Sequence, residues 1–533
     1  MPRPPTRHPG RARRLLCAAS LFVAASAAAG GCFTDASGRR PDTNTMYFPT
    51  ALTLSAGKRV LYVANSDFDL QYSAGWLQAL DAAALRQGAL TIAAALDNNA
   101  TAAATSACAQ AGLSTNLEPW LYPGPCSPFE LAPYVKNARL IGAFASGILF
   151  VSHPDEPLAR LFVPVRGDPS ITYFDVEDDR SLAGKEPAFT LACGGSASDF
   201  CAEKNRIGRD PERTLRNITL PADPVGIASD SSGQAIITAH QTQNAASLVN
   251  NHWGKTPKLS YFAGNLPNGP TEMVALSEPA FVATARLQHD SFVYRPSFAV
   301  TFRGAAEVDL VTYYDDAGAS PNRSFVVRSA SVPLNIVASS VDSRGITVVD
   351  AQRRACEDGC EGANDLLACQ LECAEQVPLK LYVANRDPAS LLIGRVNTVV
   401  RKNDQGEPTS AFEELFFFDA VPLNFGPARV ENGHVIDKDG AFSARVFITC
   451  FDSRTVFVFD PQNERVETVV RTGRGPHDVA NDVGMYQGEP YALLYVGSFT
   501  DSYLGAIDLD MRRPSYGQVV ANFGRPTPPK EER

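Results

Sequence analysis

A repeated pair of apolar strands constrains the fold of this 533-residue chain more than any other feature of its sequence. Each copy opens with β-branched and aromatic residues, passes through a polar turn and returns to a second apolar run. The copies begin at Leu61, Leu161, Ile236, Phe298, Leu381, Val446 and Leu494. The pattern predicts seven β-hairpins.

Another apolar run, opened by a proline, precedes six of the seven hairpins. The prolines are Pro49, Pro224, Pro270, Pro333, Pro427 and Pro476. The second hairpin lacks such a proline, and residues 137–145 are its expected first strand. With a variable fourth strand, each unit is a four-stranded sheet, and such sheets repeated radially make a propeller. We therefore expect an all-β fold, a seven-bladed β-propeller over residues 46–525.

The spacing of the hairpins predicts long loop insertions. Consecutive copies begin 100, 75, 62, 83, 65 and 48 residues apart, whereas a minimal propeller repeat needs about 40–50 residues. The largest expected insertions are residues 82–134, 177–216 and 350–378. Ring closure stays open, because either residues 517–523 or the segment near Met46 can supply the last strand of blade seven.

One stretch carries a specific resemblance. Residues 446–480, VFITCFDSRTVFVFDPQNERVETVVRTGRGPHDVA, resemble the YVTN-type propeller repeat, with its valine-rich strand ending in aspartate and its glycine-x-x-proline before the next blade. The other copies match more loosely, and together they cover nearly all of residues 46–525. The resemblance implies a seven-bladed propeller and little about activity, because such propellers host many unrelated functions.

The N-terminal segment has the layout of an export signal. Residues 1–14 carry five arginines and no acid, and an apolar run follows from Leu15 to Ala29. The run is too short for a permanent membrane span. It ends in Ala29-Gly30-Gly31-Cys32, which resembles the bacterial lipoprotein signal; a plain secretory signal is the alternative. The resemblance implies lipidation of Cys32 and an anchor in the bacterial cell envelope, and it leaves open whether the protein faces the periplasm or the cell surface.

We therefore expect a signal peptide over residues 1–31, a tether over residues 32–45 and a disordered tail over residues 526–533. Phe33, rather than aspartate, follows Cys32, which in enteric bacteria implies the outer membrane. Removal of the signal changes the net charge from −10 to −15. An acidic surface argues against nucleic acid as a partner.

Cysteine usage agrees with export. Two pairs, Cys108 with Cys126 and Cys193 with Cys201, lie close in the sequence and are expected disulfides, while the isolated Cys450 is an expected buried thiol.

The remaining cysteines form two CX3C pairs, and each pair lies on one face of an expected helix. Two antiparallel helices would pair Cys356 with Cys373 and Cys360 with Cys369, as in the twin CX3C hairpin that the sequence resembles. A zinc site is the alternative, although zinc sites more often use CxxC spacing. The hairpin would leave blade five on the face opposite the residues described next.

Propeller topology brings one position of every repeat to the same rim. The residue after each second strand should lie at one end of the central channel, and these residues are Ser66, Arg166, Gln241, Arg303, Arg386, Phe451 and Phe499. His240 and Asp452 lie beside this ring, and His477 with Asp478 opens the innermost strand of blade seven. Converging arginine and histidine side chains suit an anionic ligand or partner, because guanidinium binds carboxylate or phosphate in a bidentate manner. The alternative is structural pairing, for which Asp168 and Asp387 lie in the same turns as Arg166 and Arg386.

The sequence lacks the common catalytic and metal motifs, and no histidines pair at metal-ligand spacing, so we expect neither a cofactor nor a metal. The main hypothesis is a lipid-anchored, non-catalytic platform that binds an envelope protein or an anionic ligand. The enzymatic alternative is a lactonase-like hydrolase, since some lactonases are seven-bladed propellers with an acid, a histidine and an arginine in the funnel at this end of the central channel. His477, Asp478 and Arg386 would then serve, although no lactonase motif is matched.

Overall fold

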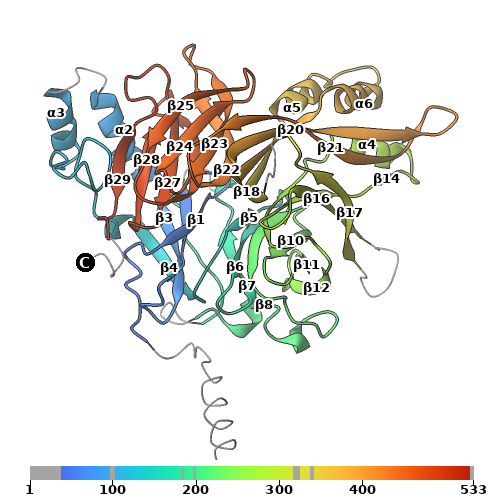
Figure 1. Ribbon diagram of the computed structural model, residues 1–533, viewed down its shortest axis with the longest axis horizontal. Helices are drawn as coiled ribbons and strands as arrows, with labels where there is room; N and C mark the ends of the chain where they lie inside the picture. The colour runs from blue at the N-terminus through green and yellow to red at the C-terminus, as the bar shows by residue number, and fades with distance from the viewer. Residues whose placement is uncertain are drawn as a thin grey trace, which may run out of the picture.

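The computed structural model describes residues 38–96, 102–181, 185–195, 200–315, 324–336 and 341–527. Within these ranges the strands form seven sheets, each built from strands in chain order, with one short strand added to the fifth. In Figure 1 the red seventh blade lies beside the blue first blade. The predicted seven-bladed β-propeller is confirmed.

The blades are numbered from the N-terminus. Blade one comprises β1 (Pro49–Leu54), β2 (Val60–Asn65), β3 (Gly75–Asp81) and β4 (Val135–Ile141), and blade two comprises β5 (Leu149–Val151), β6 (Leu158–Val165), β7 (Ser170–Glu177) and β8 (Arg206–Ile207). Blade three comprises β9 (Pro224–Ser229), β10 (Ala235–His240), β11 (Ala245–Asn250) and β12 (Lys258–Ala263). Blade four comprises β13 (Pro270–Ala275), β15 (Ser297–Phe302), β16 (Glu307–Tyr314) and β17 (Phe325–Pro333). Blade five comprises β18 (Val341–Val349), β19 (Leu379–Asp387), β20 (Ala389–Lys402) and β21 (Pro408–Pro422), with β14 (Val293–Tyr294) at its edge. Blade six comprises β22 (Pro427–Ile436), β23 (Phe442–Cys450), β24 (Thr455–Asp460) and β25 (Arg465–Arg471). Blade seven comprises β26 (Pro476–Tyr486), β27 (Glu489–Ser498), β28 (Tyr503–Asp508) and β29 (Val519–Phe523).

The middle strands of the blades are buried on both faces. Every residue of β2, β15 and β28 is buried. A blade is covered by a neighbour on each side, so its central strands need apolar residues at successive positions rather than in alternation. This packing explains the unbroken apolar runs of the repeat.

Two expectations for the innermost strands are wrong. Pro333 ends β17, the outer strand of blade four, and blade five opens with β18, which has no proline at its start. An edge strand tolerates the missing N–H of proline. Residues 135–141 form β4, the outer strand of blade one, and the innermost strand of blade two is the three-residue β5. So short a strand leaves little apolar pattern to detect.

The ring closes by packing between complete blades. β29 supplies the outer strand of blade seven, one of the two arrangements that the sequence left open. Across the seam the backbone N–H of Leu52 donates to Asp478 Oδ2 at 2.8 Å, and Lys58 Nζ donates to the carbonyl of Val483 at 2.8 Å. Blades one and seven are therefore joined by hydrogen bonds without sharing a strand.

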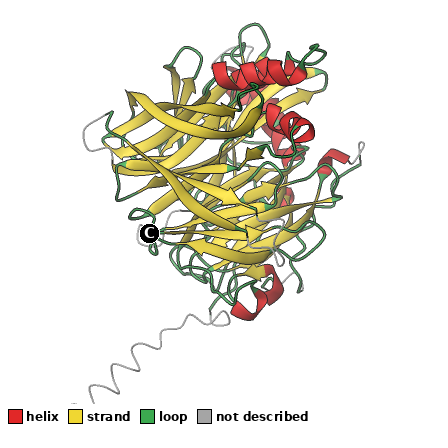
Figure 2. Ribbon diagram, turned by 90° about the vertical axis from the view of Figure 1, so that its right-hand side faces the viewer, coloured by secondary structure: helices red, strands yellow, loops and turns green. Residues whose placement is uncertain are grey.

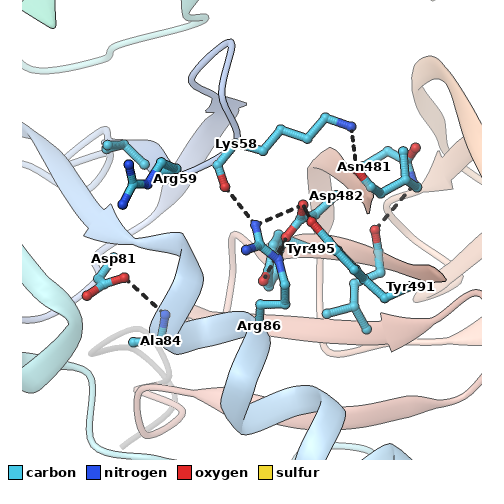
Figure 3. Close-up of polar contacts among 12 residues, drawn as sticks. Lys58, Arg59, Asp81, Ala84, Arg86, Asn481, Asp482, Tyr491 and Tyr495 are labelled. Atoms are coloured by element: carbon cyan, nitrogen blue, oxygen red, sulfur yellow. Dashed lines mark hydrogen bonds and ion pairs between the residues drawn. The ribbon is translucent and has the colours of Figure 1, made fainter. Parts of the chain in front are cut away.

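A buried ion pair reinforces this seam (Figure 3). Arg86 Nε donates to Asp482 Oδ2 at 2.9 Å, and its Nη2 donates to the carbonyl of Lys58 at 2.6 Å. The Tyr491 hydroxyl also donates to Asp482, at 2.9 Å. Arg86 comes from the insertion of blade one, so this insertion helps to close the ring.

All four expected disulfides are present, and Cys450 is buried with a free thiol. They are Cys108–Cys126, Cys193–Cys201, Cys356–Cys373 and Cys360–Cys369. The last two staple α5 (Ala351–Asp358) to α6 (Leu366–Gln376). This hairpin joins β18 to β19 where Val349 pairs with Lys380, the opposite end of the blade from Arg386. With its thiols oxidised, the quartet is a staple rather than a zinc site.

The remaining helices also belong to connections between strands and lie outside the stacked strands (Figure 2). α4 packs against α6 through apolar side chains that include Phe281 and Leu371. β8, the outer strand of blade two, lies within the expected insertion 177–216. The other helices are α2 (Ala82–Leu96), α3 (Ala102–Gln110), α4 (Phe281–Gln288) and the 3₁₀ turns η1 (Ala132–Tyr134), η2 (Asp179–Ser181), η3 (Glu203–Asn205) and η4 (Pro211–Arg213).

The segment before blade one is described from residue 38 onward, so the expected signal peptide and Cys32 lie outside the described residues. Residues 38–45 lie against blade one, where Gln78 Nε2 donates to the carbonyls of Thr43 and Thr45 at 2.7 and 3.0 Å. No described helix is both long enough and apolar enough to cross a membrane.

Candidate functional site

A cavity of about 340 Å³ opens at the end of the channel where the second strand of each blade turns into the third. We call it the upper cavity. The seven rim residues named from the sequence all line it, although they are spread over more than 430 residues of chain: Ser66, Arg166, Gln241, Arg303, Arg386, Phe451 and Phe499. The equivalent position of every blade is thus brought to one place.

The three rim arginines each pair with an acid that belongs to the next blade or directly precedes it. Arg166 contacts Asp223, and Arg386 contacts Asp452. Arg303 lies 3.7 Å from Asp342, and 55% of its side chain is exposed. The partners are therefore not the acids of the same turn, and Asp168 instead pairs with Arg206.

Two further arginines line the upper cavity and were missed from the sequence. Arg344, from β18, also contacts Asp342. Arg429, from β22, contacts Glu272 of β13 and donates to the carbonyl of Ser146 at 3.0 Å. Arg429 and Glu272 line both this cavity and the one below it, so the pair forms the floor between them.

The lower cavity, of about 500 Å³, is lined by the innermost strands of all seven blades. Glu431 and Asp478 face it, and Arg429 lies above them. Burial raises the pKa of both carboxyl groups above its usual range, although Arg429 acts in the opposite direction. Asp478, expected in the funnel, is therefore placed below the floor.

His477 faces the upper cavity as a neutral side chain. Its Nδ1 lies 2.8 Å from the carbonyl oxygen of Thr50, so Nδ1 carries the proton and donates. Burial, with a further contribution from Arg429, lowers the pKa of His477 to about 3. At neutral pH its Nε2 is consequently an acceptor.

An aromatic wall occupies one side of the upper cavity. Phe68 lies 5.8 Å from Phe144 and 5.4 Å from Phe499, measured between ring centroids. Phe499 continues the row to Phe451 at 5.9 Å and stacks on His477 at 5.5 Å. The wall spans the turns of blades six, seven and one and the loop that leads into blade two.

The other two candidate residues do not line the cavity. His240 is the last residue of β10 and is fully buried, with its Nε2 2.8 Å from Ser247 Oγ. Burial lowers the pKa of His240 to about 4. Asp452 reaches the site only as the partner of Arg386.

A simple signal could have found several missed residues. The residue directly after an opening proline lines the upper cavity in five blades, as Thr50, Val225, Thr271, Ala428 and His477. A register shift follows Pro427 and Pro476, and such bulges re-aim side chains. The adjacent His477 and Asp478, which lie at the shift after Pro476, face different cavities.

Within the described ranges, no three His, Cys, Asp or Glu side chains are grouped so that they could hold a metal ion. No family model matches the sequence, and no curated protein matches it either. Among solved structures, the chain is similar to the hydrazine synthase of Kuenenia stuttgartiensis, with 11% identity, a TM-score of 0.40, and coverage of 89% of this chain and 98% of the other. It is also similar to a periplasmic gluconolactonase of Pseudomonas aeruginosa, with 13% identity, a TM-score of 0.38, and coverage of 80% and 86%. At these identities the likeness is one of fold alone.

Proposed function

We propose that the upper cavity binds a small anionic ligand and that the protein is a non-catalytic binding platform. The observation that carries the proposal is the charge of the lining, which holds five arginines and a single acid, Glu272. The chain as a whole has a net charge of −10, so this cationic lining contrasts with the rest of the surface. Arginine suits this role because its planar fork matches carboxylate and phosphate.

The acids beside the arginines hold the guanidinium groups without using all their donors. Arg166 donates to Asp223 through Nε, and Arg344 donates to Asp342 through Nε and Nη2. The side chain of Arg303 makes its ion pair without any hydrogen bond to the described residues. A guanidinium has five N–H donors, so each of these arginines retains donors for a ligand.

The arrangement of the cavity favours binding over hydrolysis. The trio required by the lactonase alternative is divided, because Asp478 lies below the floor and accepts from the Leu52 N–H. His477 has its Nδ1 on a backbone carbonyl rather than on a carboxylate. It therefore lacks the orienting acid that usually accompanies a histidine base.

The proposed location is the bacterial cell envelope, with a lipid anchor at Cys32 and the outer membrane as the site. The motif Ala29-Gly30-Gly31-Cys32 supports this proposal. A Cys32→Ala variant should lose lipid labelling and leave the membrane fraction. Retention of the lipid by this variant would contradict the anchor.

The binding proposal is tested by isothermal titration of the protein with inorganic phosphate and with citrate at low salt. Replacing Arg303 and Arg344 together by Gln should lower both affinities at least about tenfold, since charge-assisted contacts contribute about 1.5–3 kcal/mol each. The matched control is Arg213→Gln, which removes an exposed arginine paired with Asp210 at 3.0 Å and outside the cavity. Equal affinities in the double variant and the control would overturn the proposal.

Hydrolysis is tested by following acid release from glucono-δ-lactone. We expect the rate of acid release with the protein present to equal the rate in buffer alone. A saturable rate that disappears in His477→Gln would contradict the non-catalytic role.

A further inference from the structure

We propose that the ligand of the upper cavity is an aryl anion, with a planar apolar ring at one end and a carboxylate or phosphate at the other. This inference rests on the proposed anion binding and adds the second half of the ligand. It follows from the aromatic wall on one side of the cavity and from three of the five lining arginines on the opposite side.

The aromatic side is centred on blades seven and one. Phe499 lies in the turn after β27 and Phe68 in the turn after β2, and their ring centroids are 5.4 Å apart at an angle of 73°. Phe144 meets Phe68 at 90°. Aromatic rings prefer edge-to-face or offset-stacked neighbours, so this row of rings can pack against a further aromatic group.

Three of the five lining arginines lie across the channel and form its cationic side, whereas Arg166 of blade two and Arg429 of blade six lie beside the aromatic wall. Arg303 follows β15 in blade four, and Arg344 and Arg386 belong to blade five. In a ring of seven blades, the fourth and fifth are the ones opposite the first. A ligand lying across the cavity therefore meets phenyl rings at one end and guanidinium groups at the other.

Phe68 is the residue that points most directly to an apolar ligand group. Its side chain is 54% exposed even though it lines a cavity beside other phenylalanines. Covering so large an apolar area is favourable by roughly 25 cal/mol per Å² removed from water. A bare phosphate has no apolar surface with which to cover this ring.

The size and the remaining polar groups agree with this ligand class. A volume of about 340 Å³ is at the small end of ligand pockets and suits a single ring with one acidic substituent. His477 stacks on Phe499, so its neutral ring extends the apolar wall. Its Nε2 acceptor can receive a hydrogen bond from a hydroxyl or N–H substituent on the ligand.

The test compares phenyl phosphate with inorganic phosphate by isothermal titration of the full-length protein. We expect phenyl phosphate to bind at least about tenfold more tightly, as burial of a ring against several aromatic side chains predicts. Equal affinities for the two probes would overturn the aryl proposal and leave the anion proposal standing. Failure of both probes to bind would overturn both proposals.

Two variants assign the affinities to the two sides of the cavity. Phe68→Ala should lower the affinity for phenyl phosphate about fivefold and leave that for inorganic phosphate unchanged. Arg303→Gln should lower both. The matched control is Phe418→Ala, which removes a phenylalanine that is 51% exposed on β21 and does not line the cavity. Equal effects of Phe68→Ala on the two probes, or equal effects of Phe68→Ala and the control on phenyl phosphate, would overturn the aryl proposal.

Discussion

The upper and lower cavities lie in the same channel but are built from different parts of the blades. The upper cavity opens where strands end and turns begin, and its exposed arginines Arg303 and Arg386 pair with acids at an accessible rim. The lower cavity is lined by the innermost strands of the blades, from which Glu431 and Asp478 both face it. Turns can vary without disturbing the sheets, whereas strand residues also serve blade packing. We therefore predict that substitutions above the floor change ligand affinity, whereas substitutions at the floor and below it change stability.

The largest expected effect comes from the floor. Arg429→Met should reduce the free energy of unfolding by about 3–5 kcal/mol, because it leaves Glu272 without its cation in a largely buried position. Unfolding in urea measures the loss. The matched rim variant, Arg303→Met, should lose less than about 1 kcal/mol, since its side chain is half exposed.

A double variant separates a missing partner from a missing packing contact. Replacing Arg429 and Glu272 together by Met removes both charges and should recover most of the stability lost in the single variant. Equal losses for Arg429→Met and Arg303→Met would erase the difference between floor and rim.

A smaller effect should appear in the pH dependence of stability. Burial raises the pKa of Glu431 above its value in the unfolded chain. The folded protein then retains the proton longer than the unfolded chain, so the contribution of Glu431 is fully present at acid pH and is lost as the pH rises through the folded-state pKa. Glu431→Gln should therefore show a smaller fall in unfolding free energy than the wild type between about pH 5 and about pH 8.

The control for this prediction is a neighbour that cannot ionise. Asn432→Ser removes the hydrogen bond from Asn432 Nδ2 to the carbonyl of Val348. Its stability should run parallel to the wild type at every pH. A Glu431→Gln profile that also runs parallel to the wild type would show that the lower cavity does not perturb the carboxyl group.

The repeat was sufficient to predict the blades and the position of the rim residues, because both depend on strand order alone. The direction of individual side chains was harder to predict. His240 immediately precedes a rim residue, yet it is buried within its blade because neighbouring strand residues point to opposite faces. Register shifts directly after the opening prolines changed this alternation elsewhere. Arg344 was missed because its strand has no opening proline.

The ion pairs of the rim were predicted as a type of interaction but assigned to the wrong partners. Asp387 lies next to Arg386 in the chain, whereas the acid that Arg386 contacts is Asp452, from the next blade. Proximity in sequence favoured the first, but the packing of adjacent blades determines the second. Contacts between blades depend on the conformation of the turns at the rim of the channel. The repeat pattern in the sequence does not determine that conformation.

The smallest expected effect on stability belongs to the rim acids, and it sharpens the comparison most directly. In the Arg386–Asp452 pair, 29% and 49% of the side chains are exposed, so Asp452→Asn should change the unfolding free energy by less than about 1 kcal/mol.

The same change, Asp452→Asn, removes a negative charge that competes with the ligand for the guanidinium of Arg386. The affinity for inorganic phosphate should rise about fivefold, equivalent to about 1 kcal/mol for one nearby charge. Asp210→Asn, beside Arg213 and outside the cavity, should leave the affinity unchanged. A fall in affinity for Asp452→Asn would mean that the guanidinium needs its acid to stay in position, and the rim pairs would then be structural in the same sense as the pair at the floor.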